Sequence, residues 1–337
     1  MLRLTTALGA VSERKLNRIM LGLIAALVVG LPTIGVVYVL DRNVDPGLPL
    51  TERAIVAGED AVRAEPNKLS NRLQLAAAYT AAGRSSDALA QYAAVVEADP
   101  DNRIALLGRG DTYVALGELD AAARDYQALV DATSDGEMAK VDPQLEAAYY
   151  GLGSIALQQG RPRDAATMLA NALTINGTDA DALNLMGTAL LRIDDKKGAI
   201  DALRAATALV PTGWCEPYVQ LANAYTTGGN TLGTQYANGM VAMCEKRSAD
   251  AELLLQPLVS GPFGRDALIG LALTAEDLGD RETAVAFYSR VFAADPTDFD
   301  AVTGLNRLGA GTPAASADPA AAPGPASAPP LGTGGEN

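Results

Sequence analysis

A pattern of small and aromatic residues recurs along the chain about every 34 residues, which is a period typical of stacked helical repeats. The clearest copy carries the markers Tyr79, Gly83, Ala88, Tyr92 and Pro100. Six copies are present, and they start near Leu69, Arg103, Glu146, Ala180, Cys215 and Arg265. A chain with such an internal repeat folds as an array of similar units, so this feature restricts the fold more than any other.

Each copy is predicted to form two helices joined by a short turn. Leu75, Ala76 and Tyr79 fall on one face of a helix. Gly83 marks the turn, and Pro100 ends the second helix because the residue before a proline disfavours helix. A lone helix pair cannot bury its apolar faces, whereas stacked pairs can. The sequence therefore predicts an all-α fold with a solenoid of six helix hairpins over residues 69–308.

These markers and their period resemble the tetratricopeptide repeat family, and the resemblance covers residues 69–300. The fifth copy is the weakest, with Asn238 where an apolar residue is expected. The resemblance implies a right-handed α-solenoid whose first helices line a groove for a protein or peptide partner. The family's carboxylate-binding version needs Lys and Arg at set positions, and only Arg192 lies near one of them.

The family lines its groove with the second, fifth, ninth, twelfth and thirteenth residues of each first helix. Carried over to this sequence, these positions include Leu73, Leu107, Tyr150, Asn184, Thr188, Arg192 and Asn223. We expect an apolar groove in the early repeats and a polar one in the middle repeats. The amides of Asn184 and Asn223 either bond the backbone of an extended peptide or only satisfy local helix ends. Asp179 and Asp181 are interpreted as acids at a helix N-terminus, where the helix dipole favours them.

Four segments depart from the repeat. Residues 133–141 predict a loop or a longer helix end, and the apolar residues 251–264 predict a short helix packed on the solenoid. Residues 297–309 predict a final capping helix, and residues 41–68 a membrane-proximal linker with a cap helix near Thr51–Ala64. The Pro/Ala/Gly-rich residues 309–337 are poor in large apolar side chains and predict a disordered tail.

An apolar run near the N-terminus predicts a membrane anchor. The 22 residues from Ile19 to Leu40 carry no charged side chain, which is enough to cross a hydrocarbon core of about 30 Å. Residues 1–18 carry a basic excess, so we expect them in the cytoplasm of a bacterium and everything after Leu40 outside the inner membrane. The alternative is a cleaved signal peptide, which has a shorter apolar region and a small-residue cleavage site that "VVYVLDRNVD" lacks.

The two cysteines both belong to the fifth copy. Cys215 is expected to begin its first helix and Cys244 to end its second. Because the helices of a hairpin are antiparallel, these ends come together, and an oxidising compartment would allow a disulfide. The alternative is two buried thiols that serve as small apolar side chains.

The sequence offers little to catalysis. It has no histidine, the commonest general base and metal ligand, and no glycine-rich phosphate loop with its lysine. We therefore expect no enzyme activity, cofactor, metal or small-molecule substrate, and the net charge of −14 argues against nucleic acid. The predicted function is a membrane-anchored extracytoplasmic scaffold or chaperone-like adaptor for a protein or peptide, a membrane complex among the candidate partners. The alternative is a constitutive subunit of a membrane or envelope complex.

Overall fold

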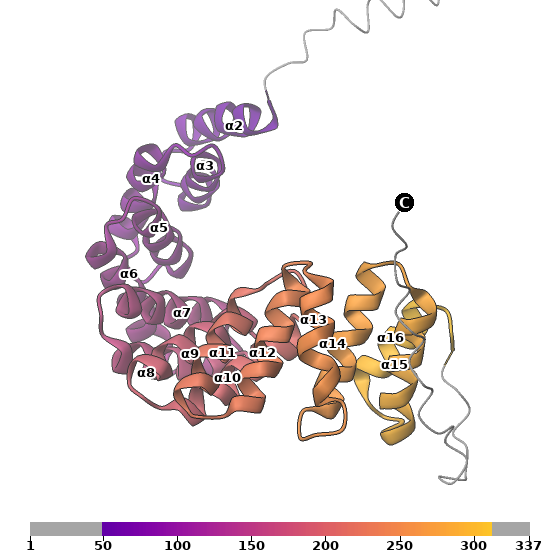
Figure 1. Cartoon of the computed structure of the whole chain (residues 1–337). Helices are drawn as coiled ribbons and strands as arrows, with labels where there is room; N and C mark the ends of the chain where they lie inside the picture. Colours follow the sequence, from indigo (N-terminus) through magenta and orange to yellow (C-terminus); the bar gives the residue numbers. More distant parts are fainter. Residues whose placement is uncertain (1–48, 312–337) are drawn as a thin grey trace, which may run out of the picture. The chain divides into compact units, whose positions relative to one another are not determined.

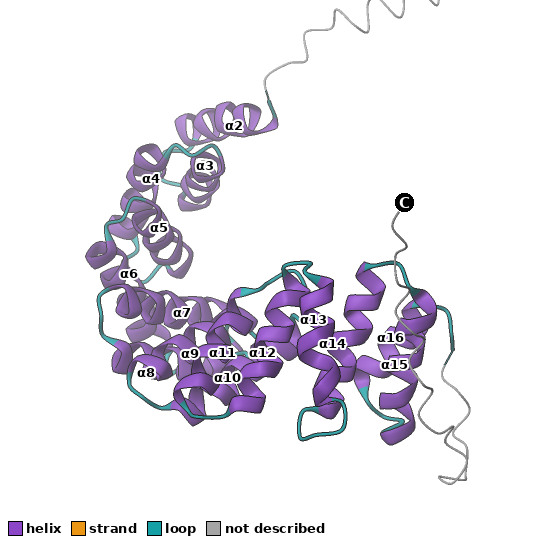
Figure 2. Ribbon diagram, in the orientation of Figure 1, coloured by secondary structure: helices purple, strands orange, loops and turns teal. Residues whose placement is uncertain are grey.

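The structure, a computed structural model, describes residues 49–311 as helices joined by turns, and it contains no β-strand in that range (Figure 2). The predicted all-α fold is confirmed for this part of the chain. The described residues fall into two compact units, one ending at Ala98 and the other beginning at Asp99.

The first unit contains α2 (Leu50–Ala64), α3 (Leu69–Ala81) and α4 (Ser85–Ala98). Helix α2 is the helix expected near Thr51–Ala64, and it packs against α3. Two side-chain bonds hold it there: Asn71 Nδ2 donates to the carbonyl of Ala61 at 3.0 Å, and the Tyr79 hydroxyl donates to Glu59 Oε1 at 2.8 Å. The hairpin α3–α4 is the first repeat, with an N-terminal helix covering it.

The second unit holds the other five hairpins (Figure 1). The hairpins are α5 (Arg103–Ala115) with α6 (Leu119–Thr133), α7 (Pro143–Gln158) with α8 (Pro162–Ile175), α9 (Ala180–Arg192) with α10 (Lys196–Leu209), α11 (Glu216–Thr227) with α12 (Thr231–Cys244), and α14 (Gly264–Asp277) with α15 (Arg281–Ala294). Together with α3–α4 they are the six predicted repeats. We call α5, α7, α9, α11 and α14 the first helices of this unit.

Small residues let the two helices of a hairpin approach closely. A Cβ added to Gly110 would lie 2.6 Å from the ring of Tyr126, and one added to Gly187 would lie 2.5 Å from Leu203 Cγ. These contacts explain why glycine recurs at this repeat position: a larger side chain would push the paired helix away. The turn between α9 and α10 departs from the pattern, because Asp194 takes the positive φ of 66° that glycine takes elsewhere.

The interruptions of the repeat form short elements. Residues 133–141 complete α6, turn, and end in the 3₁₀ helix η1 (Ala139–Val141). The apolar insertion contains α13 (Ser248–Leu255) and η2 (Gln256–Leu258), and α13 packs between α12 and α14. Helix α16 (Phe299–Arg307) packs on α15 at the end of the array. Both the inserted helix and the final helix were predicted.

The two cysteines are joined in a disulfide. Cys215 is the N-cap of α11 and Cys244 is the last residue of α12, and their Cα atoms lie 5.5 Å apart. The structure thus has the first of the two alternatives that the sequence left open. In the chain-entropy model, a loop of this size stabilises the fold by roughly 3–4 kcal/mol.

Among residues 49–311, no helix has the length and apolar character needed to span a bilayer. The expected anchor at 19–40 lies outside the described residues. The same is true of the expected cytoplasmic segment at 1–18 and of the tail beyond residue 311.

Candidate functional site

Four successive first helices of the second unit contact one another in the order α5, α7, α9 and α11. Thr188 Oγ1 of α9 lies 2.6 Å from Gln220 Oε1 of α11, to which it donates. On the other side, Arg192 Nη1 of α9 donates to the carbonyl of Leu157 in α7 at 2.7 Å. We call the surface formed by these four helices the first-helix face.

The predicted groove residues differ in how open they are. Leu107, Tyr150 and Thr188 are half-buried on the first-helix face, and Asn223 is exposed. Arg192 is exposed, but its guanidinium bonds the last turn of α7 and so fastens one repeat to the next. Leu73 is half-buried in α3, within the first unit.

Asn184 is the predicted residue whose environment differs most from the expectation. It is only 4% exposed. Its Oδ1 atom is buried and accepts no hydrogen bond from the described residues. The Oδ1 atom is therefore neither open to a peptide backbone at the surface nor satisfying a local helix end. It is a buried acceptor without a donor, which is costly unless a donor arrives.

The first-helix face is apolar at α5, as the sequence predicted. Ile104 is 55% exposed and Val114 is 37% exposed. Val219 of α11 adds an apolar side chain that is 50% exposed. Exposed branched side chains on the same face as Tyr150 and Asn223 give this surface both apolar and polar groups.

An acid pair that sequence reasoning missed lies at the N-terminal ends of α7 and α9. It consists of Glu146 in α7 and Asp179, the N-cap of α9, whose Oδ1 accepts from the N–H of Ala182 at 3.0 Å. Burial and the hydrogen-bonding Asp179 carboxyl raise the pKa of Glu146 to about 7. Near neutral pH the Glu146 carboxyl group is therefore about half protonated.

Tyr150 lies beside this acid pair. Burial raises the pKa of its hydroxyl, and the charges of Asp181, Asp179 and Glu146 raise it further. Asp179 and Asp181, which the sequence predicted at a helix N-terminus, thus raise the pKa of a predicted groove residue in the neighbouring repeat. The N-cap role of Asp179 agrees with the prediction, whereas its pairing with Glu146 did not follow from the sequence.

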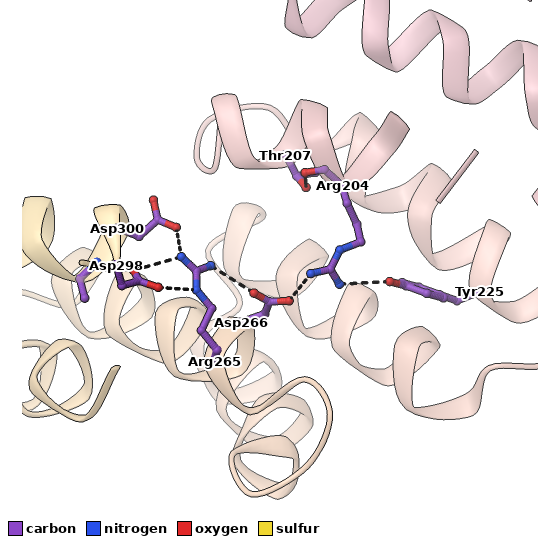
Figure 3. Close-up of polar contacts among 8 residues, drawn as sticks. Arg204, Thr207, Tyr225, Arg265, Asp266, Asp298 and Asp300 are labelled. Atoms are coloured by element: carbon purple, nitrogen blue, oxygen red, sulfur yellow. Dashed lines mark hydrogen bonds and ion pairs between the residues drawn. The ribbon is translucent and has the colours of Figure 1, made fainter. Parts of the chain in front are cut away.

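A second acidic region, the arginine–aspartate cluster, contains its own cations (Figure 3). Arg265 of α14 bonds three aspartates: Asp266 at 3.1 Å, Asp298 at 2.8 Å and Asp300 at 2.5 Å. Arg204 of α10 bonds the other oxygen of Asp266 at 2.7 Å. This chain of ion pairs connects α10, α14 and the start of α16.

The same cluster shows how a cation changes a carboxyl group. Burial raises the pKa of Asp298, but the hydrogen bond from Arg265 and that from the N–H of Ala301 outweigh it, so the pKa lies below its ordinary value. A small cavity of about 90 Å³ adjoins the cluster. A larger cavity of about 240 Å³ lies between α6, α7 and α8, away from the predicted groove residues.

Comparison with family models gives two matches to repeats of one type. A model described as tetratricopeptide repeat matches residues 73–137 and 150–213, and a second model with the same description matches residues 266–298. The chain is a member of the tetratricopeptide repeat family. The matched ranges leave out 214–265, which holds the fifth repeat and α13.

A comparison with solved structures gives matches to other helical proteins, one of them at a TM-score of 0.50. The tetratricopeptide repeat protein YrrB, whose structure is described as having an unusual peptide-binding site, superposes with a TM-score of 0.50 at 19% identity. That match covers 60% of this chain and 98% of YrrB. The MamA protein matches with a TM-score of 0.48 at 23% identity, over 55% of this chain and 95% of MamA. No curated protein matched the chain in sequence.

Proposed function

We propose that this chain is a membrane-anchored, extracytoplasmic scaffold or chaperone-like adaptor that binds a protein or peptide segment across the first-helix face. One observation carries the proposal: successive first helices expose apolar and polar side chains on one surface, including Ile104, Val219 and Asn223. Exposed apolar groups rimmed by polar ones are typical of protein-binding surfaces. An extended segment would lie across the four helices and contact one repeat after another.

The fold supports this kind of function. Tetratricopeptide arrays are protein-interaction scaffolds, and the described YrrB site is one for a peptide. The location is supported by sequence alone, through the apolar run at 19–40 and the basic residues before it. The disulfide between Cys215 and Cys244 suits an oxidising compartment.

Site-specific photocrosslinking in intact cells tests the binding surface. A photoreactive residue replaces Asn223, which is exposed on α11, or Thr174, which is exposed on the second helix α8. We expect a discrete crosslinked partner from position 223 and a much weaker one from position 174. Equal adducts from both positions, or none from 223, would remove the first-helix face as the binding surface.

The amount of crosslinked partner separates the two functional classes. An adaptor captures several partners, each below the molar amount of the chain. A constitutive subunit captures one partner in equal amount.

Protease added to spheroplasts tests the location separately, because it should digest the repeats and leave residues 1–18 protected. Protected repeats would reverse the proposed orientation.

A further inference from the structure

In three first helices of the second unit, the residue at the repeat start interacts with the N-cap of a later helix. That later helix is the next first helix in two cases and α16 in the third. These residues lie seven positions before the small residue at the hairpin contact, at Arg103, Glu146 and Arg265. Two of the three are arginines. Arg103 forms an ion pair with Asp142, the N-cap of α7, and Arg265 forms one with Asp298, the N-cap of α16. In these two places the repeat start supplies a guanidinium to the aspartate that begins the following helix.

Glu146 occupies the third place, and it meets Asp179, the N-cap of α9. A carboxyl group therefore stands where the second and sixth repeats have a guanidinium. Glu146 Oε1 is buried and accepts no hydrogen bond from residues 49–311. When Glu146 is ionised, the two facing carboxylates provide only acceptors, so the pair then lacks the donors that Arg265 supplies to Asp298.

The surroundings of the acid pair add further negative charge. Asp181 contributes one more negative charge. The charges of all three acids raise the pKa of the nearby Tyr150 hydroxyl. Asn184 lies one helical turn beyond Asp181 on the same face of α9. Its Oδ1 is a second buried acceptor without a donor, and it is independent of the acids. Glu146, Tyr150 and Asp179 are only partly buried, so part of each side chain faces solvent beside the covered Glu146 Oε1 atom.

We propose that the acid pair binds an arginine side chain of the partner segment, which takes the place that Arg265 fills beside Asp298. A guanidinium has five N–H donors and forms paired bonds to carboxylates, so it supplies donors to both acids. The two arginines that the chain itself uses in the equivalent places favour this cation over others. The inference rests on the proposed function, since it names the chemistry of the segment bound on the first-helix face.

Glu146→Arg tests the inference by filling the site from within. The new arginine should pair with Asp179 as Arg265 pairs with Asp298, so the full-length variant should unfold at a higher temperature than the parent chain. The matched control is Glu282→Arg, which makes the same charge change at an exposed position of α15. A lower melting temperature for Glu146→Arg than for Glu282→Arg would show that the site does not accept a guanidinium, and would overturn the proposal.

Binding is measured by fluorescence anisotropy with two labelled probes. One is a short peptide of alternating serine, leucine and arginine, and the other has uncharged citrulline in place of each arginine. The parent chain and Glu282→Arg should prefer the arginine peptide. In Glu146→Arg this preference should fall about tenfold, the size expected for losing one charge-assisted hydrogen-bonding site. An unchanged preference would contradict the inference.

The crosslinker at position 223 separates this inference from the proposed function. If Glu146→Arg still crosslinks its cellular partner as strongly as the parent chain, the arginine site is wrong while the binding surface stands. If the parent chain captures no partner at position 223, the proposed function itself fails.

Discussion

The third and the last repeats place carboxyl groups at corresponding positions, yet the two regions have opposite electrostatics. Asp179 and Asp298 are both N-caps, and each accepts a hydrogen bond from the N–H three residues later. Beside Asp298 stands Arg265, which lowers the pKa of that aspartate despite its burial. Beside Asp179 stands Glu146, whose own pKa rises to about 7. The two contacts thus differ by one residue at the repeat start. Arg265 gives Asp298 a cation from within the chain, whereas Glu146 gives Asp179 none.

The difference shows how a repeat protein can gain a binding site without a change of fold. In the last repeat, cations from α10 and α14 satisfy the aspartates, and the cluster fastens three helices together. In the third repeat the corresponding position leaves the Glu146 Oε1 atom without a donor. Unsatisfied buried groups reduce stability, and a partner that supplies the missing donors recovers that free energy on binding.

The largest effect is expected from Arg265→Glu. This substitution puts a second carboxyl group beside Asp298 and so makes the last repeat resemble the third. The side chain of Asp298 is 8% exposed and would lose its cation, while Asp300 and Asp266 would add repulsion. We expect the free energy of unfolding to fall by about 3 kcal/mol, at the low end for breaking a buried ion pair because Arg265 itself is half exposed. Thermal and denaturant unfolding measure the change. Arg290→Glu, an exposed position in α15, is the control, and equal losses in both variants would show that net charge alone is responsible.

A smaller effect is expected from Arg103→Gln, which tests whether the contact between α5 and α7 resembles that between α14 and α16. Asp142 is nearly buried and caps α7 through the N–H groups of Gln144 and Leu145, so it keeps part of its stabilisation without Arg103. We expect a loss of about 1–2 kcal/mol, measured by denaturant unfolding. A loss of unfolding free energy below about 0.5 kcal/mol, the range of ordinary surface substitutions, would mean that Arg103 does not stabilise the contact between α5 and α7.

The smallest effect is a pH dependence located at Glu146. Its pKa is raised from the ordinary value of 4.5 to about 7, so the folded chain holds this proton more tightly than the unfolded chain. The stabilisation is complete below pH 4.5 and is lost as the pH rises through 7. Since the carboxyl group is only partly buried, we expect the loss between these pH values to be about 1 kcal/mol.

Glu146→Gln isolates this contribution, because an amide cannot titrate and also supplies a donor to Asp179. The difference in unfolding free energy between the variant and the parent chain should grow as the pH rises from 5 to 8. A difference that stays constant over this range would show that folding does not raise the pKa of Glu146.

Much of the fold was predictable because it depends on local patterns. The glycine and alanine markers fix where hairpins turn and where helices touch, so the six repeats, α13 and α16 follow from the sequence. The positions of Cys215 and Cys244 at two outer helix ends likewise allowed a disulfide to be predicted. The weak fifth repeat also lies outside the family-model matches.

The candidate site was harder to predict because its contacts join different repeats. Glu146 and Asp179 are 33 residues apart in the sequence, and nothing in either segment alone shows that they meet. A signal was present in the repeat starts, where Glu146 stands at the position that Arg103 and Arg265 occupy in two other repeats. The burial of Asn184 could not be derived, because the position rule for a groove gives which way a residue points and not how far its neighbours cover it.

The disulfide of the fifth repeat also limits how far the chain can be stretched. Cys215 and Cys244 are separated by 29 residues along the chain but by 5.5 Å in space. An extended chain covers about 3.5 Å per residue, so the bridge withholds about 100 Å of contour length when the ends are pulled apart. Under tension, the residues before Cys215 and those after Cys244 can extend while the chain between them stays closed. A solenoid held at one end by a membrane and at the other by a partner would therefore yield in two separate steps of limited length.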